Sequence, residues 1–202
     1  FASIFFFISS INFFNFIDGS DGFASGIFSS ALLFFVYFYF LANNYDLFIF
    51  TSICFFSSLV FLYFNFSPAK IFLGDSGSTI LGFIFAILSI IGFHNLLFPF
   101  WFPLILIFPF LLDSSITILK KIYKKDKFWL AHNEHYYQRL ILMGMSHKKL
   151  SLISCFYVLC SGLLGLVLNY CNDFRFTIIT FVMLTIIFST LLFKVDQKWI
   201  IR

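Results

Sequence analysis

The sequence predicts an all-α fold, a polytopic helical bundle of an integral membrane protein. Of the 202 residues, 61% are hydrophobic and only 11% are charged, whereas a soluble globular domain carries about 25% charged residues. Long apolar runs recur between short polar breaks, and a run of about 20 apolar residues can cross a bilayer as a helix. The runs are continuous rather than alternating, which argues against a transmembrane barrel.

About six complete apolar segments and one partial segment account for the expected helices. The partial segment, residues 1–14, is too short to span a bilayer, and the chain starts with Phe1 rather than Met, so we expect a truncated amino terminus. The segment 97–119 contains three prolines, which predict a kink that neighbouring helices can accommodate. We expect residues 1–202 to form a single membrane-embedded domain. The complete segments are residues 24–42, 47–66, 78–94, 97–119, 150–169 and 174–193.

Basic residues are distributed unevenly between the two sets of loops. One side holds only three short loops, residues 43–46, 94–97 and 169–174, and of the 13 Lys and Arg residues only Arg175 lies there. The other side holds the loops at about 12–24, 67–78 and 120–149 and the tail after Phe193. By the positive-inside rule this second side is cytoplasmic. Because the polar clusters described next also lie there, we expect an active site at the inner membrane surface.

The first polar cluster contains two amides and two carboxylates, Asn12, Asn15, Asp18 and Asp21, spaced three residues apart. Charge at a membrane boundary is costly unless it is used or solvated, so the cluster is a candidate functional site. Oxygen ligands of this kind suit Mg²⁺ and also suit hydrogen bonds to a sugar or nucleotide. A solvated helix cap, with Asp as an ordinary turn former, is an equal alternative.

The second cluster is the stretch Gly74–Ser78, directly before an apolar segment. Helix amino termini bind anions through their free N–H groups, and Asp75 in this place suggests a metal ion held between protein and phosphate. A Walker A loop does not fit, because no Gly-Lys-Ser/Thr follows. Capping of the helix by Asp75 or Ser76 is the alternative.

The third cluster follows a lysine-rich stretch and comprises His132, His135 and Arg139, which are spaced about one helical turn apart. A basic, donor-rich helix face suits a diphosphate. A zinc site is a weaker alternative, since the common helical zinc motif has an i,i+4 histidine pair. Asp113 is the main polar residue inside an apolar segment; it either orients substrate or faces the headgroups.

Together, the three clusters resemble the motifs of the polyprenyl-phosphate N-acetylhexosamine-1-phosphate transferases. The family pattern N-x-x-D-G-x-D-G-x-A matches Asn15–Ala24, the pattern F-x-G-D-x-G-S matches Phe72–Ser78, and A-H-x-x-H-x-Y-Q-R-L matches Ala131–Leu140. The last form resembles the branch that makes O-antigen and capsule precursors. The family also carries an adjacent Asp-Asp pair that is missing here, so the resemblance implies a fragment comprising roughly the carboxy-terminal two-thirds.

The resemblance implies transfer of a sugar-1-phosphate from a UDP-N-acetylhexosamine-type sugar to undecaprenyl phosphate, with release of UMP, at the bacterial inner membrane. It implies Mg²⁺, or Mn²⁺ in its place, with Asp75 as the metal ligand. Asp18 and Asp21 then surround the nucleotide or metal, assisted by Asn12 and Asn15. The implied roles of the third cluster are contacts of His132, His135 and Arg139 with the diphosphate, while Asp113 orients the substrate.

The expected partners are these two substrates and membrane lipids, with no nucleic acid; a homodimer stays open. Two other readings stay open as well. A non-catalytic transporter or lipid-binding protein predicts polar residues at the midplane of several helices, and an inactive truncated relative predicts no turnover.

Overall fold

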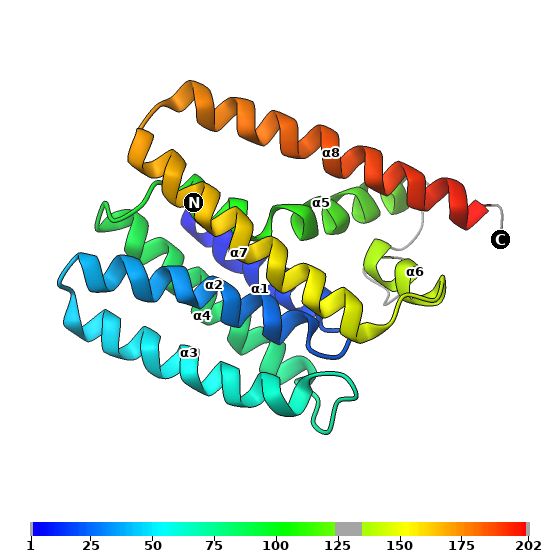
Figure 1. The fold of residues 1–202 in the computed structure, drawn as a ribbon, viewed down its shortest axis with the longest axis horizontal. Helices are drawn as coiled ribbons and strands as arrows, with labels where there is room; N and C mark the ends of the chain where they lie inside the picture. The colour runs from blue at the N-terminus through cyan, green and yellow to red at the C-terminus, as the bar shows by residue number, and fades with distance from the viewer. Residues whose placement is uncertain (1, 124–134, 201–202) are drawn as a thin grey trace.

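The computed structural model describes residues 2–123 and 135–200, and within these residues it contains eight α-helices and no strand (Figure 1). The predicted all-α class is therefore confirmed. Six of the described helices, all except α1 and α6, are long and apolar enough to cross a membrane, which indicates a multi-pass membrane protein. The helices are α1 (Ala2–Ile17), α2 (Phe23–Leu41), α3 (Tyr45–Asn65), α4 (Gly74–His94), α5 (Trp101–Tyr123), α6 (Tyr136–Leu142), α7 (His147–Cys171) and α8 (Phe174–Ile200).

Several helices extend beyond the apolar segments from which they were predicted. Helix α1 continues through Ile17, so the first loop is only residues 18–22, and α4 already begins at Gly74. Apolar composition marks where a chain enters lipid, whereas backbone hydrogen bonding continues into the headgroup region. Helix α5 instead begins later than predicted, at Trp101, because Pro99 lacks an N–H donor and disfavours a helical residue before it.

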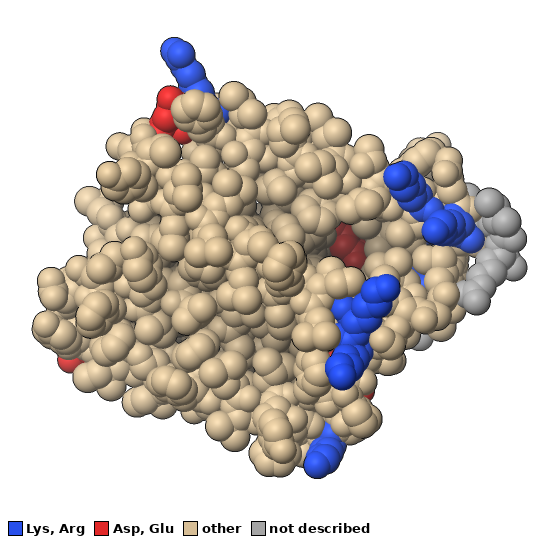
Figure 2. Space-filling view, viewed as in Figure 1, with Lys and Arg blue, Asp and Glu red and all other residues tan. Residues whose placement is uncertain are grey.

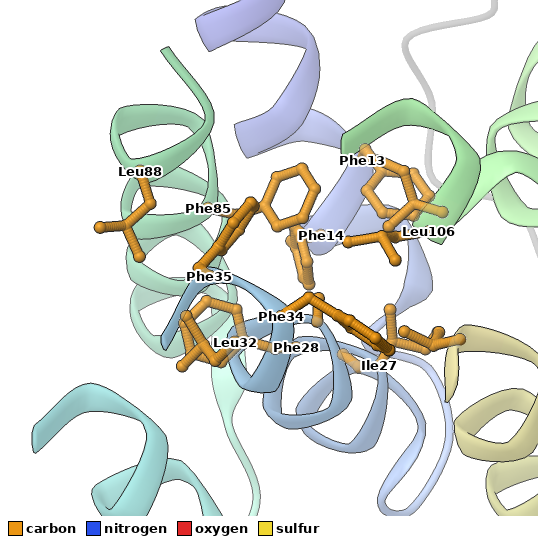
Figure 3. Close-up of a cluster of buried hydrophobic side chains, with 14 of the residues drawn as sticks. Phe13, Phe14, Ile27, Phe28, Leu32, Phe34, Phe35, Phe85, Leu88 and Leu106 are labelled. Atoms are coloured by element: carbon orange, nitrogen blue, oxygen red, sulfur yellow. The ribbon is translucent and has the colours of Figure 1, made fainter. Parts of the chain in front are cut away.

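Helix α2 is the central helix of the bundle and packs against α3, α7 and α4. Its inner faces meet a core rich in aromatic rings, in which Phe14, Phe28 and Phe85 come from three different helices (Figure 3). The Phe14 and Phe28 rings meet edge to face with centroids 5.9 Å apart, a favourable aromatic geometry. Since lipid tails are as apolar as the core, such packing contacts hold the helices together.

Close approach of α1 to α4 depends on Gly82. A Cβ atom at this position would lie 2.6 Å from the Cα of Ile11 and 2.7 Å from the Ser10 carbonyl oxygen. Small residues at a helix crossing let two backbones come together in a membrane. This crossing is important for the candidate site, because the site ends of α1 and α4 carry Asn15 and Asp75.

Lys and Arg side chains gather at one end of the bundle, on the right in Figure 2, where α1, α3, α5 and α8 end and α2, α4 and α7 begin (Figures 1 and 2). We call this end, formed by loop 18–22, loop 66–73 and helix α6, the basic end. The opposite end is formed by the connections at 42–44, 95–100 and 172–173. The alternating helices thus bring the predicted polar clusters of residues 12–24 and 67–78 to one end.

Candidate functional site at the basic end of the bundle

The turn between α1 and α2, residues 18–22, is held by two neighbouring segments. The Ala69 backbone N–H donates to the Asp21 carboxylate (3.2 Å), and the Ser151 hydroxyl on α7 donates to the Gly22 carbonyl (2.8 Å). Gly22 itself has a φ of 67°, a left-handed conformation that glycine adopts at little cost. The turn is therefore fixed rather than a freely solvated cap, and Asp21 faces the 66–73 loop.

Asn65, at the end of α3, joins the same turn to the 66–73 loop. Its side-chain oxygen accepts from the Gly22 N–H (3.1 Å) and the Ser25 hydroxyl (2.7 Å), and its amide nitrogen donates to the Ile71 carbonyl (2.9 Å). Only 5% of Asn65 is exposed. It was not among the predicted site residues. The available signal was a lone amide at the end of an apolar segment, where a buried polar group requires partners.

Asn15 brings the first and second polar clusters together. From the last turn of α1, its amide nitrogen donates to the Ser78 hydroxyl (3.1 Å) and, over a longer distance, to the Asp75 carboxylate (3.4 Å). Asp75 lies in the first turn of α4 and is exposed. Asn12 is also exposed, one turn earlier on α1. The contact of Asn15 with Asp75 therefore joins residues 60 positions apart in the sequence.

Asp18 and Asp75 form the acidic part of the site. Partial burial and the negative charge of Asp75 raise the pKa of Asp18 from 3.8 to about 6, although the Gly74 backbone N–H, which bonds its carboxylate, opposes the increase. Two carboxylates close enough to repel each other create a place that favours a cation. Among the described residues no group of three or more His, Cys, Asp and Glu side chains could hold a metal ion. The pair suits Mg²⁺, which is commonly bound by one or two carboxylates together with substrate phosphates and water.

The third cluster is only partly described, because His132 lies outside the described residues. His135 is the residue before α6, which begins at Tyr136, and its backbone is extended rather than helical. His135 and Arg139 therefore do not share one regular helix face as predicted. The His135 ring packs against Phe16 of α1, with centroids 5.7 Å apart.

Tyr137 docks α6 directly onto the α1–α2 turn. Its hydroxyl donates to the Phe16 carbonyl (2.9 Å), and its ring packs against Phe23 at 4.9 Å between centroids. An added Cβ at Gly19 would lie 2.3 Å from this hydroxyl, so the glycine leaves room for the tyrosine. Burial and, secondarily, the charge of Asp113 raise the pKa of Tyr137, so the hydroxyl stays neutral and remains a donor.

Asp113 is buried in α5 and receives donors from the protein. The backbone N–H groups of Tyr136 and Tyr137 donate to its two carboxylate oxygens (2.9 and 3.1 Å), and the Thr117 hydroxyl donates as well (3.2 Å). Its carboxylate thus faces α6 and not the headgroups. A substrate-orienting role for Asp113, as predicted, would in this geometry act through α6 and the neighbouring His135.

Arg139 is paired with Asp196 on α8, a residue that was not predicted to take part in the site. Arg139 Nη1 donates to Asp196 Oδ1 (2.8 Å), and Lys120 and the Tyr136 hydroxyl donate to Asp196 Oδ2. The Arg139 Nε is buried and has no acceptor within the described residues. The pairing depends on α8 packing beside α6, and no sequence spacing indicates it.

Comparison with known proteins agrees with the resemblance found in the motifs. Residues 1–93 match the family described as glycosyl transferase family 4. A Bacillus subtilis (strain 168) protein named "Probable undecaprenyl-phosphate N-acetylglucosaminyl 1-phosphate transferase" is 32% identical over 136 residues, which cover 66% of this chain and 38% of that relative. A Staphylococcus epidermidis protein (strain RP62A) and a Staphylococcus aureus protein (strain Newman), both named "Phospho-N-acetylmuramoyl-pentapeptide-transferase", are each 32% identical over 157 residues, covering 75% of this chain and 46% of each relative.

These matches span less than half of the length of each curated relative. The family match, residues 1–93, includes the α1–α2 turn and the first turn of α4, where Asn15, Asp18 and Asp75 meet. The chain belongs to glycosyl transferase family 4.

Proposed function

We propose that this protein transfers a sugar-1-phosphate from a UDP-N-acetylhexosamine-type sugar to undecaprenyl phosphate, releasing UMP, as an initiating step in cell-envelope polysaccharide synthesis. The observation that carries the proposal is the meeting of Asp18, Asn15 and Asp75 at one end of a membrane bundle. The names of these relatives, which describe transferases of sugar phosphates, support the same reaction class. The form of the third motif favours an O-antigen or capsule pathway.

The position of the site suits a reaction between a water-soluble nucleotide sugar and a lipid phosphate. Such substrates meet only at the membrane interface, and Asp18 and Asp75 lie at the ends of apolar helices. The basic residues gathered at this end support a cytoplasmic orientation in the bacterial inner membrane. They also attract anionic membrane lipids.

The reaction joins two anions, so catalysis rests mainly on positioning and on neutralising charge at the phosphates. Mg²⁺, or Mn²⁺ in its place, would supply that neutralisation when bound, and Asp75 together with Asp18 would hold it. Asn15 keeps the Asp75 carboxylate in place through its amide donor. Asp21, tied to the 66–73 loop, and the exposed Asn12 would border the nucleotide.

His132, His135 and Arg139 are assigned to the diphosphate. For Arg139 this assignment requires a guanidinium donor that Asp196 does not occupy. No general base is assigned, because a phosphate monoester with a second pKa of about 6 is already largely ionised at neutral pH.

The test of the reaction is incubation of membranes containing the protein with undecaprenyl phosphate, Mg²⁺ and a panel of UDP-N-acetylhexosamines. We expect UMP to appear with at least one sugar and only when undecaprenyl phosphate is present. Omission of the lipid is the control for hydrolysis. Movement of a nucleotide sugar or lipid across the membrane without UMP would instead support a transporter, and no turnover with any sugar would contradict the proposed reaction.

A further inference from the structure

Asp113 is a buried carboxylate that accepts three hydrogen bonds, yet it belongs to none of the three polar clusters. It is 8% exposed and sits in α5, a helix that crosses the membrane by length and composition. A carboxylate in such a place is energetically costly unless its oxygens accept hydrogen bonds. Here the N–H groups of Tyr136 and Tyr137 and the Thr117 hydroxyl donate to these oxygens.

The two backbone donors are the first two N–H groups of α6. Such groups have no partner within their own helix, and a negative charge at a helix amino terminus is favourable. Helix α6 has only seven residues, too few to be stable alone. Asp113 therefore caps α6 from a different helix and ties its start to α5.

The same carboxylate faces the ring of His135. Nδ1 of His135 lies 3.5 Å from Asp113 Oδ1, while the faces of the ring pack against Phe16 and Tyr137, at 5.7 and 5.9 Å between centroids. The imidazole is thus held on its faces by two aromatic rings and on its Nδ1 side by a carboxylate. Its second nitrogen, Nε2, is separated from Nδ1 by the ring carbon Cε1, and its hydrogen-bonding direction diverges from that of Nδ1.

We propose that Asp113 is a positioning residue that caps α6 and holds His135 by Nδ1, so that Nε2 is the atom that meets a phosphate of the substrate. This inference rests on the proposed transferase function, because the phosphate belongs to that reaction. It differs from a direct contact of Asp113 with substrate, since the oxygens of Asp113 already accept donors from α5 and α6.

The first test compares Asp113→Asn, His135→Ala and the double variant by UMP release. Residues that orient a metal-ligating histidine through its other ring nitrogen typically change activity roughly 10–100-fold when altered, and we expect a loss of similar size in kcat for Asp113→Asn. The double variant should be no slower than His135→Ala alone, because Asp113 acts through His135. Multiplied losses, or near-normal turnover of Asp113→Asn, would overturn the proposal.

Asp173→Asn is the matched control for the first test. Asp173 also accepts a backbone N–H near a helix start, that of Arg175 (2.8 Å), but it is at the opposite end of the bundle. The same substitution there should leave turnover unchanged. A comparable loss in Asp173→Asn would show that removal of any such carboxylate harms the protein generally.

A second pair of variants leaves Asp113 intact and so does not depend on its replacement being folded. The amide nitrogen of Gln reaches approximately the position of histidine Nε2, whereas that of Asn reaches approximately the position of Nδ1. His135→Gln should therefore retain more turnover than His135→Asn. Equal turnover of the two variants, or more in His135→Asn, would contradict the assignment of Nε2.

Amide hydrogen exchange tests the capping of α6 by Asp113 independently of the reaction. In the unsubstituted protein the Tyr136 and Tyr137 amides should exchange slowly, and Asp113→Asn should speed exchange in the 135–142 peptide while peptides of α2 are unchanged. Unchanged exchange would refute the cap itself. If Asp113→Asn loses the cap but keeps normal turnover, the positioning role is refuted and the transferase proposal stands. If the unsubstituted protein releases no UMP, the transferase proposal fails, whatever the exchange rates are.

Discussion

At the scale of single residues, the site depends on carboxylates that are placed against each other or against backbone donors. Asp18 is partly buried beside Asp75, Asp21 accepts the Ala69 N–H, and Asp113 accepts two N–H groups of α6. The three environments differ physically. Repulsion at Asp18 favours a cation, whereas hydrogen bonds at Asp21 and Asp113 satisfy the charge within the protein.

The raised pKa of Asp18, about 6 in the folded protein against 3.8 for a free Asp, predicts a pH-dependent stability. Because the folded pKa is the higher one, the stabilising contribution of the protonated group is complete below pH 4 and is lost as the pH rises through 6. Without metal, melting temperature should therefore fall between pH 4 and 7 more in the unsubstituted protein than in Asp18→Asn. Solvent screens a partly buried group, so we expect a difference of about 2–4 °C, equivalent to about 1 kcal/mol in a chain of this size.

Measurement of the melting temperature in detergent at both pH values, with a chelator present, checks this expectation. Addition of Mg²⁺ at pH 7 should raise the melting temperature of the unsubstituted protein more than that of Asp18→Asn, since a ligand that binds only the folded state stabilises it. Parallel pH profiles for the two proteins would contradict the raised pKa of Asp18.

At the scale of secondary-structure elements, two contacts assemble the site from separate helices. The α1–α4 crossing at Gly82 places Asn15 beside Asp75, and the docking of α6 places Tyr137 against Gly19 and Phe16. Both contacts require a glycine, which has no Cβ atom, on one of the two contacting segments. Each can therefore be disturbed by adding one methyl group.

Gly82→Ala should weaken the α1–α4 crossing. The new Cβ would meet the backbone of Ser10 and Ile11, which cannot move without shifting α1, and overpacking of this kind costs about 1–3 kcal/mol. We expect a lower melting temperature and reduced UMP release. Gly77→Ala is the matched control for melting temperature on the same helix, because the three atoms nearest to its Cβ all belong to the flexible Leu73 side chain; an equal fall in melting temperature for the two substitutions would contradict this explanation.

Gly19→Ala should displace α6 from the α1–α2 turn, because the added Cβ would overlap the Tyr137 hydroxyl. We expect UMP release to fall by about tenfold or more, as small displacements of catalytic groups commonly cost this much. Tyr137→Phe removes the overlapping oxygen, so the double variant should recover part of the loss relative to Gly19→Ala. If the double variant is no better than Gly19→Ala, the contact with the hydroxyl is not the cause.

At the scale of the whole molecule, apolar run length was sufficient to predict the class of fold and the six long helices, because crossing a bilayer demands length and composition alone. The distribution of Lys and Arg likewise predicted that the loops of the basic end lie on the same side of the membrane. The contact between Asn15 and Asp75 could not be predicted from their spacing in the sequence, since it depends on how closely α1 approaches α4. Asn65, Asp196 and the cap formed by Asp113 depend in the same way on the packing of helices distant in sequence. The predicted site residue His132 lies outside the described residues and stays a prediction.

The central claim is that Asp75, held beside Asp18 at the basic end, is needed for a Mg²⁺-dependent transfer of sugar phosphate to a lipid phosphate. The most direct measurement is UMP release by Asp75→Asn in membranes supplied with undecaprenyl phosphate, Mg²⁺ and the accepted UDP-sugar. Asp46→Asn, at the opposite end of the bundle in the first turn of α3, is the control. We predict that Asp75→Asn is folded but releases no UMP above background, whereas Asp46→Asn is fully active. Near-normal, Mg²⁺-dependent turnover of Asp75→Asn would contradict the claim.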